Sequence, residues 1–333
     1  MYAIPQSRQR TPLSNSNFHI DFSLETYRNE YFISNDPKKV LCFFESFKRR
    51  EELLNWMRER PKGVGYIHEV EGEKEIVVVI PTGNISGEFA IRCREDIFKG
   101  LHIIFVESGE IPDPFFNVGR NVNIGIRKAL SYNPKWIILS ADDVYKIDDI
   151  QLLKVKLSQL DDREIDAVFI SESKYHSIPV RFSKARFTRF LIMMLKRNLP
   201  VKEKFSIGLK QISLENRFKI KYFVSPRHRF QLLKYKHGYK FTSFTDFGIL
   251  SSNYLRQHSD HHFDETFVNA QEDHDVNMRL SSEGVRCIHI PFRLGDYIGS
   301  SFGMGIAREL RELAGFMYLN YKWENRLETL DRE

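Results

Sequence analysis

Three apolar runs of strand length, each followed by polar turn residues, most constrain how this 333-residue chain can fold. Continuous apolar and β-branched runs are typical of strands buried on both faces of a parallel sheet. Helical patterns separate the runs, and the order strand, helix, strand predicts right-handed crossovers. All three polar tips should therefore meet at one edge of the sheet. The runs are residues 76–80, 101–106 and 136–139, and the tips are Thr82-Gly83-Asn84, Glu107-Ser108-Gly109 and Ser140-Ala141-Asp142-Asp143.

Asp142 and Asp143 follow the third run directly. The carboxyl edge of an open α/β sheet is where such sheets bind ligands. Two carboxylates there repel each other unless a cation lies between them, and Mg²⁺ is bound by one or two carboxylates together with substrate phosphates. A pair of solvated loop aspartates is the alternative, and this stretch alone does not separate the two interpretations. The convergence of three polar tips favours the ligand site.

The rest of the chain divides into an N-terminal extension, a main domain and a C-terminal helix. Residues 1–35 show no clear periodicity and predict an extended arm, whereas 36–60 follow a helical pattern that ends at Pro61. We expect this helical extension to pack against the main domain. The predicted divisions are 1–70, 71–300 and 301–333. Further predictions are helices over 87–99, 119–132, 149–160 and 271–280, strands over 166–171, 241–250 and 285–290, and an amphipathic helix after Gly305.

The positive charge is concentrated in residues 181–240, which hold seventeen Lys and Arg residues against two acidic ones. Within it, 184–197 has the pattern of a basic amphipathic helix, which suggests an anionic membrane surface. The alternative is that its apolar face packs on the domain. Residues 217–240 interleave aromatic and basic side chains, as nucleic-acid-binding surfaces do. The remainder of the chain is acidic and would repel phosphate backbones, so nucleic acid is the less favoured partner.

The three cysteines, Cys42, Cys93 and Cys287, are few and far apart. This pattern argues against a disulfide framework or a zinc site and fits a reducing compartment. The first eighteen residues are polar and contain no apolar stretch of signal-peptide length. We therefore expect a cytoplasmic protein that is either free or peripheral at the membrane.

Several motifs together resemble the family-2 glycosyltransferases of the GT-A fold. Residues 76–84 are similar to the opening strand and loop of that family, and the Glu107-Ser108-Gly109 tip corresponds to its base-contacting turn. Ser140-Ala141-Asp142-Asp143 occupies the position of its DxD motif. The resemblance covers residues 75–290. The remaining similar motifs are Asn117-Val118-Gly119, Asn123-Ile124-Gly125-Ile126, Phe263-Asp264-Glu265, Glu272-Asp273 and Arg279-Leu280.

This resemblance implies an α/β fold of the GT-A, Rossmann-like type, with a mostly parallel sheet flanked by helices. It also implies transfer of a sugar from a UDP-, GDP- or dTDP-sugar to a hydroxyl of a glycan or lipid-linked acceptor. Asp142 and Asp143 would hold Mn²⁺ or Mg²⁺, which stabilises the diphosphate leaving group as a Lewis acid. Asp273 would be the general base, with Glu272 beside it, and a single base predicts inversion. The implied donor-binding residues are Pro81, Thr82, Gly83, Glu107, Ser108, Arg120, Asn123 and Asp142.

The chain departs from the family at the DxD position, where Ser140 or Ala141 replaces the first aspartate. Acids in the first turn of a helix also favour its dipole without any function, which is the alternative for Glu272 and Asp273. Two other functions stay open. One is a lapsed GT-A domain that binds nucleic acid or membrane. The other is a sugar nucleotidyltransferase, against which residues 82–87 contain no cation for a triphosphate.

Overall fold

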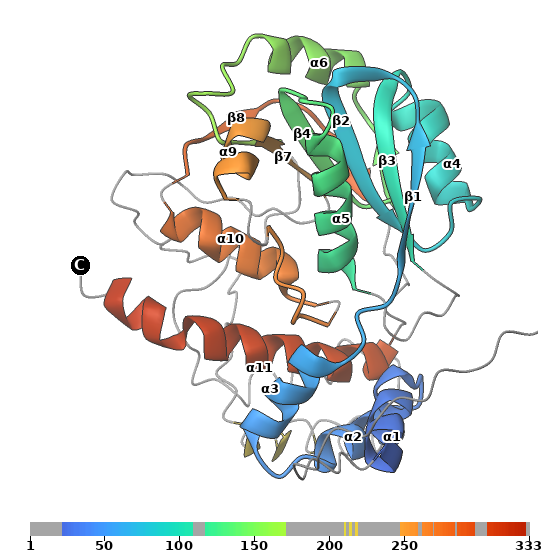
Figure 1. Ribbon diagram of the computed structural model, residues 1–333, viewed down its shortest axis with the longest axis vertical. Helices are drawn as coiled ribbons and strands as arrows, with labels where there is room; N and C mark the ends of the chain where they lie inside the picture. Colours follow the sequence, from blue (N-terminus) through green and yellow to red (C-terminus); the bar gives the residue numbers. More distant parts are fainter. Residues whose placement is uncertain are drawn as a thin grey trace, which may run out of the picture.

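The computed structural model describes residues 22–108, 117–170, 247–258, 262–268, 270–283, 285–296 and 305–330, with 210, 213, 214, 217 and 218. Within these residues the protein is mixed α/β, with a mostly parallel central sheet flanked by helices (Figure 1). This arrangement is compatible with a Rossmann-like fold. The predicted basic helix at 184–197 and most of the interleaved stretch at 217–240 lie outside the described residues.

The central sheet has seven strands in the order β1-β3-β2-β4-β7-β6-β8. β1 and β7 run antiparallel to their neighbours, and the other pairs are parallel. A small second sheet joins β5 (Val144–Lys146) to β9 (Leu294–Asp296). The strands of the central sheet are β1 Gly65–Val70, β2 Glu73–Thr82, β3 Leu101–Ser108, β4 Trp136–Ser140, β6 Ala167–Ile170, β7 Phe247–Ser251 and β8 Cys287–Ile290.

The runs at 76–80, 101–106 and 136–139 form parallel strands, as predicted, and they are neighbours in the sheet. β2 pairs in parallel with β3 on one side and with β4 on the other, so that Val79 is flanked by Ile104 and Leu139. All three residues are fully or almost fully buried. Because the three strands run in one direction, their polar tips lie at the same edge.

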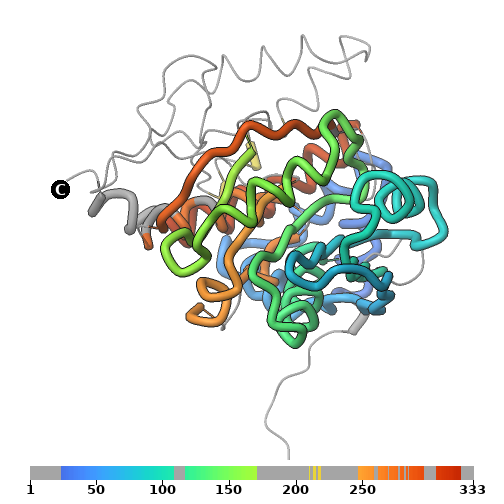
Figure 2. The backbone as a smooth tube through the Cα atoms, turned by 90° about the horizontal axis from the view of Figure 1, so that it is seen from above, coloured from blue at the N-terminus to red at the C-terminus, as the bar shows by residue number. Residues whose placement is uncertain are grey.

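Helices cover both faces of the sheet and create two apolar cores. α4 and α6 pack on one face, and α5, α9 and α10 pack on the other. Figure 2 shows α4 and α6 on one side of the strands and α5 and α9 on the opposite side. The bounds of these helices are α4 Glu88–Arg92, α5 Val118–Leu130, α6 Ile150–Ser158, α9 Ser252–Gln257 and α10 Glu272–Ser282.

The helix predicted over 87–99 begins as α4 and continues as a π-helical turn, Cys93–Ile97. The amide of Phe98 closes this turn by donating to the carbonyl of Cys93 at 2.9 Å. Gly100 follows with φ of 90°, a conformation that glycine adopts without steric cost. The predicted helix is thus confirmed and ends before Gly100, while the wider π-helical turn at its end was not predicted.

Close packing of α5 on the sheet depends on Gly125. A Cβ atom at this position would lie 2.3 Å from Cγ1 of Val79 in β2. Only a residue without a side chain lets the helix backbone approach the strand this closely. Gly125 therefore sets the height of α5 above the sheet and, with it, the position of the helix start near the strand tips.

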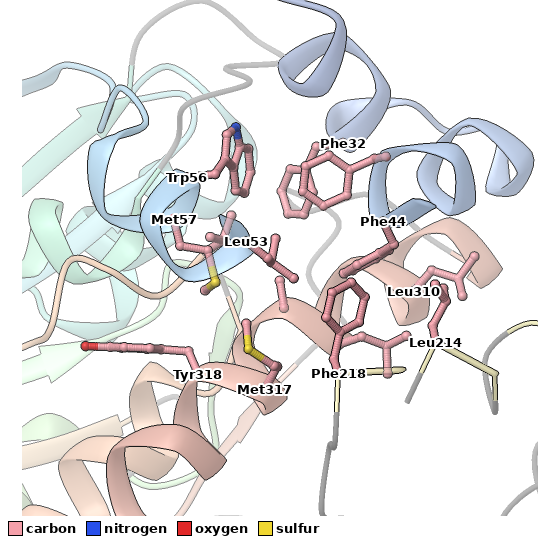
Figure 3. Packing of buried hydrophobic residues seen from close by; sticks show 14 of the residues in the cluster. Phe32, Phe44, Leu53, Trp56, Met57, Leu214, Phe218, Leu310, Met317 and Tyr318 are labelled. Carbon is pink, nitrogen blue, oxygen red and sulfur yellow. The ribbon is translucent and has the colours of Figure 1, made fainter. Parts of the chain in front are cut away.

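A third core joins the N-terminal helices to the C-terminal helix. α1 (Phe22–Ile33), α2 (Pro37–Glu45) and α3 (Arg50–Glu59) pack with α11 (Gly305–Leu330), as Figure 3 shows for their buried side chains. The expectation of an extended arm through residue 35 is therefore wrong for α1. Phe32 packs 4.9 Å from Phe43 and 5.1 Å from Trp56 between ring centroids, contacts that local periodicity does not reveal.

The helical pattern at 36–60 is two helices, α2 and α3, separated by residues 46–49. Asp36 caps α2, accepting from the amide of Lys38 at 2.9 Å. β1, at 65–70, belongs to the central sheet, whereas the expected division placed these residues in the N-terminal extension, 1–70. Among the described helices, none is long and apolar enough to cross a bilayer.

Candidate functional site

The tips of β2 and β4 are joined by a side-chain hydrogen bond. Thr82 is the last residue of β2 and is 2% exposed, and its Oγ1 donates to Oδ2 of Asp142 at 2.7 Å. Asp142 follows β4 by two residues. The parallel pairing of β2 and β4 brings these two tips together, so a carboxylate is fixed at the carboxyl edge of the sheet.

The Asp142 carboxyl lies in a poorly solvated position. Burial raises its pKa above the ordinary value, and the hydrogen bond from Thr82 opposes that rise. Asp143 beside it is buried. The thiol of Cys93, from the π-helical turn, donates to the Asp142 backbone carbonyl at 3.4 Å. A nearby cation would favour the ionised form of both carboxylates and so offset the cost of burial.

The tip of β3 orders the loop that follows β2. Glu107 accepts from the amide of Ile85 through Oε1 at 2.8 Å, and its Oε2 lies 2.9 Å from Nε2 of His68. Ser108 Oγ donates to the carbonyl of Thr82 at 3.4 Å. The Glu107 carboxylate thus holds two partners from its own chain. His68 was not singled out in the sequence, because it lies in a strand, β1, that the sequence did not predict.

Pro81 and Gly83 border Thr82 on either side of the strand end. Pro81 is still in register with Val106 of β3, while Gly83 belongs to the loop. The amide of Asn84 donates to Thr82 Oγ1 at 3.3 Å. The hydroxyl of Thr82 is therefore held from both sides, as a donor to Asp142 and as an acceptor from the loop.

Arg120 and Asn123, both predicted to bind the donor, are engaged with other segments of the chain. Asn117 caps α5 by accepting from the amide of Arg120 at 2.9 Å, and the Arg120 guanidinium donates to the carbonyl of Gly63. Asn123 is fully buried and both donates to and accepts from the backbone of Phe263, at 2.8 and 2.9 Å. The two Asn123 contacts fasten the segment 262–268 to α5.

The same segment leads into α10, whose first residues are Glu272 and Asp273. Burial, then the charge of Asp273, raises the pKa of Glu272 to about 8, and its Oε2 is buried without a hydrogen-bond partner among the described residues. Asp273 Oδ1 lies 3.1 Å from Nδ1 of His274. Burial lowers the pKa of His274, but Asp273, Glu272 and Glu312 together outweigh this effect, and the pKa is raised. The α10 start therefore holds two acids in different environments, a pattern suited to acid–base roles.

α11 holds the α10 region through a half-buried charge cluster in which Asp275 is buried. Lys322 Nζ lies 2.7 Å from Asp264 Oδ2 and 2.8 Å from Asp275 Oδ2. The Trp323 indole donates to Asp275 Oδ1 at 2.7 Å, and the Tyr318 hydroxyl donates to Asp264 at 2.8 Å. No local pattern marks Asp275 or Lys322, since their partners are about fifty residues apart.

The predicted site residues thus form two groups. Thr82, Glu107, Ser108 and Asp142 meet at the strand tips. Glu272 and Asp273 lie at the start of α10, where contacts with α11 and with Asn123 of α5 hold the preceding segment.

Asp142 and Asp143 are the residues that fit a divalent cation. In their ionised form the two carboxylates could contribute ligands to Mg²⁺, which completes its coordination shell with water and phosphate oxygens. No group of three or more His, Cys, Asp or Glu residues arranged to hold a metal occurs in the described part of the chain. A cation here would therefore need further ligands from outside these residues.

No protein-family model matches this chain, and the comparison with curated proteins gives no match either.

Proposed function

We propose that the protein is a nucleotide-sugar-dependent glycosyltransferase of the GT-A type, which moves a sugar from a UDP-, GDP- or dTDP-sugar to an acceptor hydroxyl. The observation that carries the proposal is the Thr82–Asp142 hydrogen bond, which fixes a poorly solvated carboxylate at the carboxyl edge of the sheet. Ligands of open α/β sheets bind at this edge.

In this proposal Asp142 and Asp143 bind Mg²⁺ or Mn²⁺ together with the donor diphosphate. When bound, the cation would stabilise the charge of the diphosphate leaving group. Glu107 and Ser108 order the loop after β2, against which the nucleotide would lie. Arg120 and Asn123 would contribute indirectly, by fastening segments beside the site.

Asp273 is the proposed general base for the acceptor hydroxyl, and Glu272 is the neighbouring acid that positions it or contacts the acceptor. Burial and the charge of Asp273 raise the pKa of Glu272, which favours its protonated form, and in that form it can donate a hydrogen bond. Asp273, as a carboxylate, would accept the proton of the acceptor hydroxyl. Direct attack with one base predicts inversion at the anomeric carbon.

The test is a thermal-shift screen of UDP-, GDP- and dTDP-sugars with and without Mn²⁺ or Mg²⁺. A ligand that binds the native state raises the apparent Tm, and no acceptor is needed for the readout. We expect a metal-dependent shift with one nucleotide, lost in Asp142→Asn and kept in the control Asp96→Asn, an exposed aspartate paired with Lys146. Absence of any shift with every donor would overturn the proposal.

A further inference from the structure

β1 (Gly65–Val70) is one of the two outer strands of the central sheet. Among the described residues it pairs only with β3, and Figure 1 shows it at the margin of the sheet. Within the described ranges, no strand pairs with the backbone groups on its other side. Such an edge is a template for pairing, and natural proteins usually protect it with charges, prolines or short strands.

The side chains along this edge are unusually apolar for an outer strand. Val64, Tyr66 and Ile67 are 50%, 55% and 41% exposed. The charges of β1 are already used within the chain, since His68 pairs with Glu107, and Glu69 accepts from Lys128 at 3.0 Å. The six residues of β1 include two exposed apolar side chains, Tyr66 and Ile67, and no lysine or proline, so the paired Glu69 is the exposed charge on this edge.

The opposite edge of the same sheet is built differently. β8 has only four residues, is preceded by the exposed Arg286 and is followed directly by Pro291, which has no amide hydrogen to donate. A short strand between a charge and a proline carries the protection expected of an outer strand. The contrast between the two edges indicates that β1 is left open for a partner strand.

We propose that β1 pairs antiparallel with β1 of a second copy of this chain, so that the two central sheets become continuous. A two-fold axis makes any strand complementary to itself in this orientation. The axis passes beside Ile67, which then lies opposite Ile67 of the partner subunit. In that register Tyr66 faces His68 of the partner subunit, and Val64 faces Val70 of the partner subunit.

This register matches the side chains on both faces. Apolar and aromatic cross-strand pairs stabilise antiparallel strands, whereas like charges opposite each other destabilise them. Glu69 falls opposite Gly65 of the partner subunit, where no side chain competes for space. Moving the axis by one residue, to His68, places Ile67 opposite Glu69 of the partner subunit and the two histidines against each other. The Ile67 register is therefore the favoured one.

The first test is sedimentation velocity of the full chain over a concentration series, with Ile67→Lys as the disrupting variant. In the dimer the substitution sets two lysines opposite each other, while in the monomer it changes only an exposed side chain. We expect the dimer dissociation constant to rise by at least about tenfold. Leu152→Lys, on the exposed face of α6, is the matched control and should leave dimerisation unchanged.

The second test checks the register by cysteine cross-linking under mild oxidation, against the wild type with its three native cysteines. Directly opposed residues have Cβ atoms about 4.5–5.5 Å apart, so Ile67→Cys should give a covalent dimer. The two copies of residue 69 are separated by about 13 Å along the strands, so Glu69→Cys should not. A monomer throughout the series, a dimer that tolerates Ile67→Lys, or cross-linking through Glu69→Cys would each overturn the proposal.

Discussion

Oγ1 of Thr82 donates a 2.7 Å hydrogen bond to Oδ2 of Asp142, and this bond joins the tips of two parallel strands sixty residues apart in the chain. The bond favours the ionised carboxylate, because it lowers the pKa that burial raises. It therefore keeps a negative charge available at the edge of the sheet where a cation would bind.

Replacing Thr82 by valine should raise the pKa of Asp142 further, because the opposing hydrogen bond is lost. It should also cost about 1–3 kcal/mol of stability, since a buried polar contact is left incomplete. Urea denaturation measures the loss of stability, and the pH dependence of Mn²⁺ binding reports the pKa of the Asp142 carboxyl. Thr82→Ser keeps the hydroxyl and is the control; equal behaviour of the two variants would contradict the role of this bond.

Replacing Asp273 by asparagine should abolish sugar transfer and leave donor binding nearly intact, because the amide cannot accept the acceptor proton. Donor binding is measured by the metal-dependent thermal shift, and turnover by release of the nucleotide diphosphate. A variant that turns over normally would rule out Asp273 as the base. Loss of the thermal shift as well would instead assign Asp273 to donor binding.

Glu272 should make the protein less stable as the pH rises. Its pKa is raised from 4.5 in the unfolded chain to about 8 in the folded protein, so the folded state binds more protons between these values. The free energy of unfolding therefore falls from about pH 4.5 to 8 and then levels off. The raised pKa of His274 acts in the same direction, and its stabilisation is lost above that pKa.

Glu272→Gln should flatten the pH dependence of the free energy of unfolding, because the amide does not titrate in this range. Urea unfolding at several pH values between 5 and 8 measures the slope for wild type and variant. Glu51→Gln, an exposed glutamate in α3, is the control and should keep the wild-type slope. Parallel curves for wild type and Glu272→Gln would show that the carboxyl is not buried as described.

Lys322→Met should destabilise the protein by about 3–5 kcal/mol, because it leaves the buried carboxylate of Asp275 without its cation. Lys146 also bridges two carboxylates, Asp96 at 3.3 Å and Asp149 at 2.9 Å, and both of these aspartates are exposed. Lys146→Met should lose much less stability, since exposed pairs contribute little. Chemical denaturation compares the stability of the two variants. Equal losses of stability would mean that burial of the Asp275 carboxylate adds nothing to the contribution of Lys322.

Gly125→Ala should destabilise the protein by about 1–3 kcal/mol, because the added methyl group meets Cγ1 of Val79. Val79→Ala removes that atom and should be destabilising alone. The double variant should be more stable than the sum of the two losses implies, a coupling that a double-mutant cycle measures. Simple additivity would indicate that α5 shifts away from the sheet instead.

Much of the sheet could be predicted from the chain itself. Runs such as 76–80 and 101–106 are buried on both faces, so their apolar character identifies them as strands without knowledge of their neighbours. The separating helices then leave only a parallel pairing, and the tips that carry Thr82, Glu107 and Asp142 meet as a consequence. The helix predicted over 149–160 is α6, and Asp149 caps it by accepting from the amide of Gln151.

α1 and β1 were outside the reach of local patterns. α1 is stabilised by Phe32 packing against Phe43 and Trp56, and β1 by pairing with β3, so both depend on partners outside their own segment. Tertiary contacts override weak local propensity in such elements.

The sequence by itself determined the order of the buried strands and the edge at which their polar tips gather, because burial on two faces and crossover geometry are local constraints. Only the tertiary structure decided the state of the acids. The pKa of Asp142 depends on Thr82, and that of Glu272 depends on burial and on Asp273. Protonation follows the surroundings of a side chain in space, and residue type or spacing does not encode those surroundings.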